Sequence, residues 1–332
     1  MRLLDLTEAG LYCPMADLHI DPVRPVARAV VTHAHADHCR PGHRALLATP
    51  ETARIARTRF GEEAFGSVQT LAYGEVLDLG GVRLTLSPAG HVLGSAQVVL
   101  EAGGRREVVS GDYKLRADPS CAPFEPVSCD LFVTEATFGL PVFRHPPVAD
   151  EIARLMASRA MFPDRCHAIG SYALGKAQRM ILELRAAGYD RVIWLHGALV
   201  KLCDLYVEMG YDLGPMAQAT VAEAEQLAGE IVLAPPGALA DRWARRLPDP
   251  VIAAASGWMR VRQRAKQRGV ELPLVISDHA DWDELCATIS ETGAGEVWVT
   301  HGAEEALCHW CSAQGIQARP LSLLGREEDE EA

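Results

Sequence analysis

Four side chains that commonly bind metal ions lie within six residues, in the segment 32–38 with the sequence Thr-His-Ala-His-Ala-Asp-His. Imidazole and carboxylate groups are usual protein ligands of Zn²⁺, Mn²⁺ and Fe²⁺. Because alternate side chains of an extended segment point the same way, His33 and His35 can bind one ion, and the following turn can direct Asp37 and His38 at a second. A chance surface cluster is the alternative, but the segment directly follows an apolar strand-like run. We therefore predict a two-metal centre here.

The pattern of expected elements changes along the chain. Short strands with regularly spaced turns predominate up to residue 147, and strands alternate with helices over 148–268. Such alternation implies a parallel sheet with helices on both faces. We predict one lobe formed by residues 1–147 and 269–325, interrupted by an inserted α/β lobe at 148–268. The acidic residues 326–332 are predicted to be a disordered tail.

The formal net charge of −12 argues against nucleic-acid binding, because phosphate contacts need a basic surface. Positive charge is nevertheless concentrated in one segment, 242–268, with Asp249 as its single acid. This segment either follows the backbone of a single-stranded nucleic acid or is a solvated helix face. Its eight basic residues are Arg242, Arg245, Arg246, Arg260, Arg262, Arg264, Lys266 and Arg268.

Composition gives weaker expectations about location. No apolar run reaches the ~20 residues that span a membrane, and the first residues lack a signal-peptide pattern, so we expect a cytoplasmic protein without membrane contact. Nine scattered cysteines argue against a disulfide framework. One Cys-x-x-Cys pair, Cys308 and Cys311, is a weak signal whose role stays open.

The histidine-rich segment resembles that of the metallo-β-lactamase fold hydrolases, whose two face-to-face sheets are flanked by helices. Further motifs of that family follow in order. The resemblance implies that His91, after Gly90, is a metal ligand, and that Asp112, after Gly111, bridges the two ions. It also implies that Asp21 does not bind the metal itself but supports the residues that do. His43 matches no motif, and we expect it at the surface.

Later motifs resemble those of the β-CASP branch, which processes nucleic acids and carries an inserted α/β lobe. Glu135 resembles the first of these motifs, His279 the second and His301 the third. Residues 170–178, Gly-Ser-Tyr-Ala-Leu-Gly-Lys-Ala-Gln, resemble a signature of the insert. The expected fold is therefore an αββα sandwich with an inserted parallel-sheet lobe.

A finer resemblance, to the bacterial DNA-ligase-associated exonucleases, rests on Ile-Asp-Pro at 20–22, the form of segment 32–38 and the compact length. It implies a DNA-repair exonuclease acting beside a ligase and a helicase. His301 points the other way, since DNA-cutting eukaryotic members often have valine there and RNA-processing members have histidine. The choice of DNA over RNA, cleavage polarity and exonuclease or endonuclease action stay open.

The resemblance implies two divalent ions, zinc with manganese as the alternative. One would be bound by His33, His35 and His91, the other by Asp37, His38 and His301, with Asp112 between them. His279, Glu135 and Asp37 are the expected catalytic residues for hydrolysis of a nucleic-acid phosphodiester. Rival hypotheses are a β-CASP ribonuclease, a small-molecule hydrolase of the same fold and an inactive repair scaffold.

Candidate substrate contacts come from turns in the inserted lobe. Ser171 and Lys176 lie where a predicted strand passes into a helix, whose free N–H groups can bind phosphate. Ser256 follows another strand, and Arg260 belongs to the basic segment. Ordinary turn chemistry is the alternative for each of these positions.

Overall fold

The computed structural model of the chain describes residues 2–321, which divide into two compact units. The first contains the described residues up to Arg144 and from His279 onward, and the second is His145–Asp278. The lobe predicted at 148–268 lies within the second unit, which extends beyond its predicted end to include β17. Its independence as a folding domain stays a prediction. The tail predicted at 326–332 lies outside the described residues.

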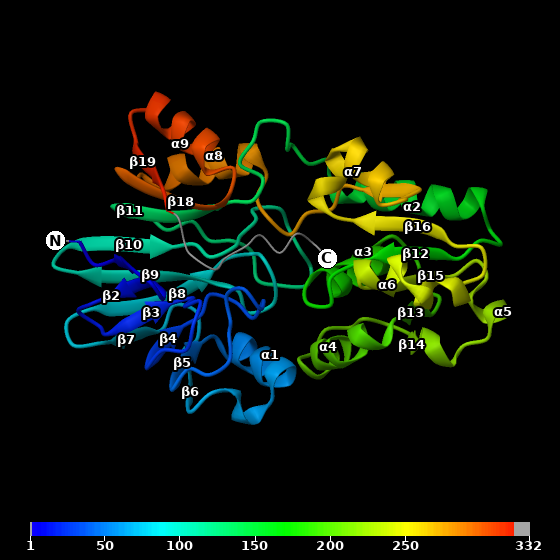
Figure 1. Ribbon diagram of the computed structural model, residues 1–332, viewed down its shortest axis with the longest axis horizontal. Coiled ribbons are helices and arrows are strands. Elements are labelled where there is room, and N and C mark those ends of the chain that lie inside the picture. The colour runs from blue at the N-terminus through cyan, green and yellow to red at the C-terminus, as the bar shows by residue number, and fades with distance from the viewer. Residues whose placement is uncertain (1, 322–332) are drawn as a thin grey trace. The chain divides into compact units, whose positions relative to one another are not determined.

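The first unit contains two mixed sheets (Figure 1). The first has the strand order β1-β2-β3-β4-β5-β6 and the second β19-β18-β11-β10-β9-β8-β7. Strands of the first sheet are β1 (Asp5–Thr7), β2 (Gly10–Cys13), β3 (Leu18–Ile20), β4 (Arg28–Val30), β5 (Ala45–Ala48) and β6 (Val68–Thr70). Strands of the second are β7 (Val76–Asp78), β8 (Arg83–Pro88), β9 (Ala96–Ala102), β10 (Arg105–Val109), β11 (Leu131–Ala136), β18 (Glu296–Gly302) and β19 (Gln317–Pro320).

Apolar side chains from both sheets form one buried core between them, including Leu11 and Val30 from the first sheet and Val98 and Val133 from the second. Removing these side chains from water is the main force that holds two such sheets face to face. The core therefore establishes a sandwich.

Helices cover the outer faces of this sandwich. Helix α1 (Pro50–Phe60) packs on the first sheet through Ala53 and Ala56. Helices α8 (Trp282–Thr292) and α9 (Glu304–Ala313) pack on the second through residues that include Leu285 and Leu307. Figure 1 shows α1 on one side of the sheets and α8 and α9 on the other. The predicted αββα architecture is confirmed.

Local chemistry fixes where two of these helices begin. Thr49 precedes α1, its side chain accepts a hydrogen bond from the backbone N–H of Thr52, and proline occupies the first helical position. Asp281 caps α8 by accepting from two backbone N–H groups, while the Glu284 side chain accepts from the Asp281 N–H. The short 3₁₀ helix η1 (Glu62–Ala64) follows α1.

The second unit is a parallel six-stranded sheet in the order β14-β13-β15-β12-β16-β17. Its strands are β12 (His167–Gly170), β13 (Ile193–Leu195), β14 (Met216–Gln218), β15 (Ile231–Ala234), β16 (Val251–Ala255) and β17 (Leu272–Leu274). Its helices are α2 (Val148–Met161), α3 (Lys176–Ala186), α4 (Gly197–Glu208), η2 (Ala219–Val221), α5 (Ala224–Leu227), α6 (Pro236–Ala240), η3 (Arg242–Arg246), η4 (Gly257–Arg260) and α7 (Arg262–Gln267). Every residue of β12 and β15 is buried, as expected for central parallel strands. Among the helices described, none has the length and apolarity to cross a membrane.

Candidate metal centre

The predicted ligands of the first unit meet near the ends of its strands. Segment 32–38 follows β4, His91 lies between β8 and β9, and Asp112 follows β10. His301 lies near the end of β18, next to the parallel strand β11. Because parallel strands end at the same edge of a sheet, residues far apart in sequence come together here.

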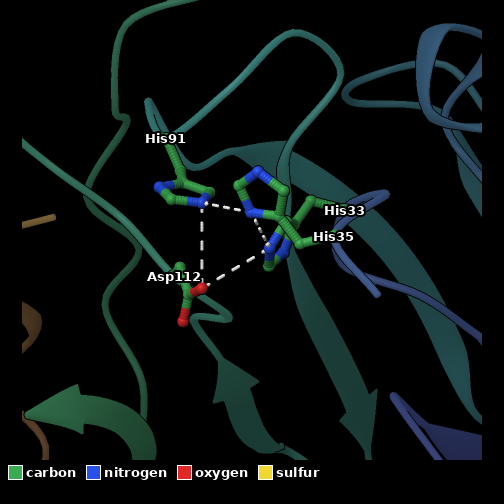
Figure 2. Close-up of side chains that lie close together, drawn as sticks. All are labelled: His33, His35, His91 and Asp112. Atoms are coloured by element: carbon green, nitrogen blue, oxygen red, sulfur yellow. Dashed lines mark hydrogen bonds and ion pairs between the residues drawn. The ribbon is translucent and has the colours of Figure 1, made fainter. Parts of the chain in front are cut away.

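Three imidazole rings and one carboxylate converge in Figure 2. His35 Nδ1 lies 3.1 Å from His33 Nε2 and 3.0 Å from His91 Nε2. Asp112 Oδ2 lies 3.4 Å from His33 Nε2 and 3.7 Å from His91 Nε2. His33, His91 and Asp112 are buried, and His35 is half-buried.

These spacings fit a metal ion. Ligands about 2.1 Å from a tetrahedral ion are separated from one another by ~3.4 Å. The measured separations of 3.0 to 3.7 Å lie around that value. Two nitrogen atoms that both lack a proton repel one another at such a separation, whereas a shared cation makes the spacing favourable. The four side chains therefore have the geometry and chemistry of a metal site.

A second group of ligand atoms adjoins the first. His38 Nε2 lies 3.2 Å from Asp37 Oδ2 and 3.3 Å from Asp112 Oδ2, and His301 Nδ1 lies 3.8 Å from Asp112 Oδ1. His38 Nε2 is buried and makes no hydrogen bond within the described part of the chain. Two carboxylate oxygens thus lie close to this nitrogen without a hydrogen bond to it, and a metal ion bound by all three atoms would satisfy them. The Asp112 carboxylate belongs to both groups.

Electrostatics favours cations here. Burial is the main cause that holds the pKa of His33 and of His91 well below the usual value, which keeps both rings neutral as metal binding requires. Burial would lower the pKa of His38 too, but the nearby carboxylates of Asp37, Asp112 and Asp21 outweigh it and raise that pKa well above its usual value. The second group thus carries an excess of buried negative charge.

Asp21, for which the resemblance implies a supporting role, contacts His38 and Thr32. Its Oδ2 lies 2.7 Å from His38 Nδ1, and its carboxylate accepts hydrogen bonds from the Thr32 N–H and hydroxyl, each 2.7 Å long. This carboxylate orients the imidazole of His38 so that Nε2 faces Asp112. Asp21 has φ = 44°, an uncommon conformation for a residue other than glycine, so local strain accompanies this position.

Glycines next to the ligands allow close backbone packing. A Cβ atom on Gly111 would lie 2.6 Å from the Thr32 side chain, and one on Gly90 would lie 2.5 Å from the Lys114 carbonyl oxygen. Gly302 has φ = 95°, and a Cβ there would clash with the Ala136 carbonyl oxygen. These clashes explain the glycines that accompany His91, Asp112 and His301 in the sequence.

Glu135 and His279 form a pair beside the ligands. The His279 Nδ1 lies 2.9 Å from Glu135 Oε2 and 3.1 Å from Oε1, and Oε1 also accepts a 2.8 Å hydrogen bond from the Tyr113 N–H. The His279 and His91 ring centroids are 4.7 Å apart. Glu135 is buried, whereas the His279 side chain is 25% exposed. A buried carboxylate therefore orients an imidazole that solvent can reach.

Lys114 is a buried supporting residue that the sequence did not reveal. Its ammonium donates to the carbonyl oxygens of Gly90 (2.6 Å) and His91 (2.8 Å) and pairs with Asp118 at 2.7 Å. It ties the backbone of the His91 loop to the segment that follows Asp112. A lysine two residues after Asp112 resembles a surface residue in a single sequence, so only the fold identifies it.

The candidate substrate contacts lie in the second unit. Lys176 is buried, and its ammonium donates to the Ile276 carbonyl oxygen (2.7 Å) and pairs with Asp278 (3.0 Å). Lys176 was predicted as a substrate contact, but its charge is already used inside the unit. Ser256 is also buried and caps η4 by accepting from the Trp258 N–H. Ser171 is buried, and Arg260 is exposed.

His43 is a further correction, because it is 1% exposed rather than at the surface. Its Nδ1 accepts a 3.3 Å hydrogen bond from the Val26 N–H, and its ring stacks on Phe65. Packing against Phe65 outweighs the ordinary preference of histidine for the surface. His43 is therefore a structural residue.

Comparison with known proteins supports the same family. No protein-family model matches the chain. A protein described as "Probable DNA ligase" from Opitutus terrae is 28% identical over 93% of this chain, which spans 30% of that protein. "Ribonuclease TTHA0252" from Thermus thermophilus is 35% identical over 40% of this chain and 36% of its own. "Endoribonuclease YSH1" from Saccharomyces cerevisiae is 32% identical over 37% of this chain and 16% of its own.

A crystal structure of a protein of unknown function from Enterococcus faecalis shares the fold, with a TM-score of 0.57 and 13% identity over 90% of this chain and 80% of that one. The sandwich of two sheets and the separate parallel sheet are consistent with the fold of these relatives. The chain is therefore similar in fold and sequence to nucleases of the β-CASP branch of the metallo-β-lactamase fold family.

Proposed function

We propose that the chain is a two-metal phosphodiesterase that cleaves nucleic acid, and specifically a DNA exonuclease that acts with a ligase in repair. The position of Asp112 carries this proposal. Its carboxylate belongs to two adjoining groups of ligand atoms, one with His33 and His91 and the other with His38 and His301. A shared carboxylate is what a pair of ions needs.

We assign His33, His35 and His91 to one ion and Asp37, His38 and His301 to the other, with zinc as the metal and manganese as the alternative. Divalent ions held there would lower the pKa of a water molecule towards ~7 and polarise the scissile phosphate. The chain's own contribution is to hold the neutral imidazoles of His33 and His91 at fixed spacing from the Asp112 carboxylate. Asp37, which is half-buried, is assigned to orient an attacking water.

His279 is assigned to the leaving group. Glu135 accepts a hydrogen bond from Nδ1, and the carboxylate stabilises the protonated ring. In that state Nε2 can donate a proton to the leaving oxygen or a hydrogen bond to the phosphate. Glu135 itself is buried and acts through His279.

The ligase relative supports a role in DNA metabolism. A protein described as a DNA ligase contains a stretch similar to 93% of this chain, and that stretch is 30% of its length. Because a protein described as a probable DNA ligase contains a stretch similar to this chain, we infer that the two act on the same substrate, DNA ends. A helicase partner and a cytoplasmic location are further parts of the proposal, inferred from the resemblance and composition alone.

A ribonuclease is the second candidate function, favoured by two relatives with ribonuclease names and by His301 at the centre. A small-molecule hydrolase has less support, because a small substrate does not need the inserted parallel-sheet unit. An inactive scaffold has less support still, because the full set of ligand side chains is brought together.

The variant Asp112→Ala tests the metal centre. It should lose both metal content and nuclease activity, because both groups of ligands lose their shared carboxylate. Metal is measured by mass spectrometry of the purified protein, and activity by cleavage of end-labelled strands. Full metal-dependent cleavage by this variant would show that the assignment is wrong.

The nucleic acid is tested separately. Wild-type protein is assayed on 5′- and 3′-labelled DNA and RNA of the same sequence, with Zn²⁺ and Mn²⁺ in turn. We expect stepwise products from DNA, and the label that is released first gives the polarity. Preferential cleavage of RNA would instead establish the ribonuclease.

A further inference from the structure

An unpaired basic surface lies on one short segment of the second unit. We define the basic face as Arg260, Arg262, Arg264 and Lys266, on η4 and α7. Arg260, Arg262 and Lys266 are exposed, and no carboxylate within the described residues forms an ion pair with them. Residues 250–270 contain no aspartate or glutamate at all, in a chain whose formal charge is −12.

Three exposed arginines elsewhere on the surface lie in ion pairs. Arg24 pairs with Glu8, Arg144 with Asp283 and Arg191 with Glu230, although each of these arginine side chains is more than half exposed. In an acidic protein, carboxylates commonly lie near a surface arginine, so pairing is the expected outcome. Its absence on the basic face therefore distinguishes this surface from those three sites.

The like charges of the basic face also destabilise the short helix that carries them. Arg262 and Lys266 are four residues apart on α7, where like charges destabilise a helix by about 0.2–0.5 kcal/mol. An external polyanion would turn this repulsion into attraction. Arg264 lies over the Trp258 ring with 3.9 Å between its guanidinium carbon and the ring centroid, which holds the planar group in place.

The position in the fold suits substrate binding. Helix η4 starts where β16 ends, at the carboxyl edge of a parallel sheet, which is the edge where such sheets bind ligands. The Ser256 N–H donates to the Leu274 carbonyl oxygen of β17, and the chain reaches His279 five residues after Leu274. The basic face is thus built on the segment that precedes the proposed proton donor.

We infer that the basic face binds the sugar–phosphate backbone of the nucleic-acid strand that the metal centre cleaves. This inference rests on the proposed function and adds the surface that holds the substrate. Several adjacent charges match the repeated charge of a polyanion, and guanidinium groups bind phosphate oxygens in pairs. The contacts are with phosphate, so they act on any sequence.

The test removes three exposed charges together, R260Q, R262Q and K266Q, and leaves Arg264 packed on Trp258. Each phosphate contact to a single strand adds about 0.7 to the slope of log K against log salt, so three contacts add about 2. We therefore expect ~100-fold weaker binding near 0.1 M salt and a shallower salt slope. Binding is measured by the anisotropy of a fluorescein-labelled single-stranded oligonucleotide, with chelator present to prevent cleavage.

A matched control removes three exposed arginines of the first unit, R24Q, R57Q and R83Q, which lie in ion pairs. It lowers the net charge equally and should weaken binding by less than about threefold. The wild-type protein, the triple variant and the control variant are also assayed with bis-p-nitrophenyl phosphate. This phosphodiester is too small to need the basic face. Its kcat/KM reports on the metal centre, and the thermal melting transition of each variant shows whether the protein is folded.

The outcomes separate this inference from the proposed function. If wild-type protein with metal cleaves neither the labelled nucleic-acid strands nor bis-p-nitrophenyl phosphate, the proposed function fails. If it cleaves both while the triple variant binds the oligonucleotide with wild-type affinity and salt slope, the basic face is not a substrate surface. An equal loss in the control would likewise overturn the inference, since it would reflect net charge alone.

Discussion

The side chains at the centre are proposed to have different roles, some in metal binding and one in proton donation. Asp112 is shared by both ligand groups, whereas His279 contacts the centre through its ring and is held by Glu135. The proposed ligands and the proposed proton donor are therefore different residues. Substitutions should distinguish loss of metal from loss of chemistry.

His279→Ala should lower kcat about 10²- to 10⁴-fold, the usual contribution of a positioned general acid. Metal content should not change, because the proposed ligand groups remain complete without this ring. Cleavage rate and bound metal are measured on the same sample. His196→Ala is the matched control, since His196 caps α4 in the second unit and should be dispensable for catalysis. Loss of metal from His279→Ala would make His279 a ligand instead.

Lys114→Met should weaken metal binding about 10- to 100-fold, the usual effect of removing a group that orients ligands. Two carbonyl groups of the His91 loop would lose their donor, and Asp118 would lose its cation. Affinity is measured by competition with a chelator, and thermal stability is recorded in parallel.

Two further variants keep this prediction testable. Lys176→Met removes another fully buried lysine and should lower stability without changing metal affinity. Asp118→Asn removes only the charged partner of Lys114 and should have a smaller effect in the same direction. Wild-type metal affinity in both Lys114→Met and Asp118→Asn would mean that Lys114 only stabilises the fold.

Strand β18 ends in a constrained backbone conformation. The strand pairs with β11 in parallel, and its register shifts between Glu135 and Ala136, next to His301 and Gly302. Both His301 and Gly302 have positive φ, at 58° and 95°. This turn directs the His301 ring toward Asp112, and it depends on close packing against the Ala136 carbonyl.

Gly302→Ala should therefore destabilise the protein by about 2–4 kcal/mol, because strain is added to a clash with backbone. Gly103→Ala is its control, with φ = 57° and nothing within 4 Å of the added Cβ, and should cost about 1 kcal/mol. Urea unfolding gives both values. Equal effects would show that the β18 end can relax.

Across the whole molecule, the proposed metal ligands all belong to the first unit, whereas the second has a core of its own. Metal that binds only folded protein stabilises it by about 2.7 kcal/mol at 100 times Kd. We expect the melting transition of the first unit to rise by roughly 5–10 °C when metal is added to apoprotein.

Calorimetry checks this expectation. If the units unfold separately, one transition should move with metal and the other should stay fixed, which also tests the predicted independence of the insert. A single transition that moves as a whole would show that the units unfold together. No shift in any transition would contradict metal binding to the native state.

Short motifs predicted the fold through the family resemblance that they carry, and that fold is confirmed. The residues by themselves predicted a metal centre at segment 32–38, because its side chains are chemically specific. The resemblance added His91, Asp112 and His301, and their role as ligands stays a prediction. Periodic alternation of strands and helices was enough to locate the inserted parallel sheet, because hydrophobic pattern follows secondary structure directly.

Only the folded chain shows which polar residues are buried and which groups they contact. Lys114 supports the His91 loop, Lys176 is paired inside its own unit, and His43 packs in the interior, none of which spacing along the chain could show. Burial depends on neighbours from distant segments, so one sequence does not reveal it. The same holds for the basic face, whose charges are visible in the sequence but whose lack of carboxylate partners among the described residues is a property of the folded surface.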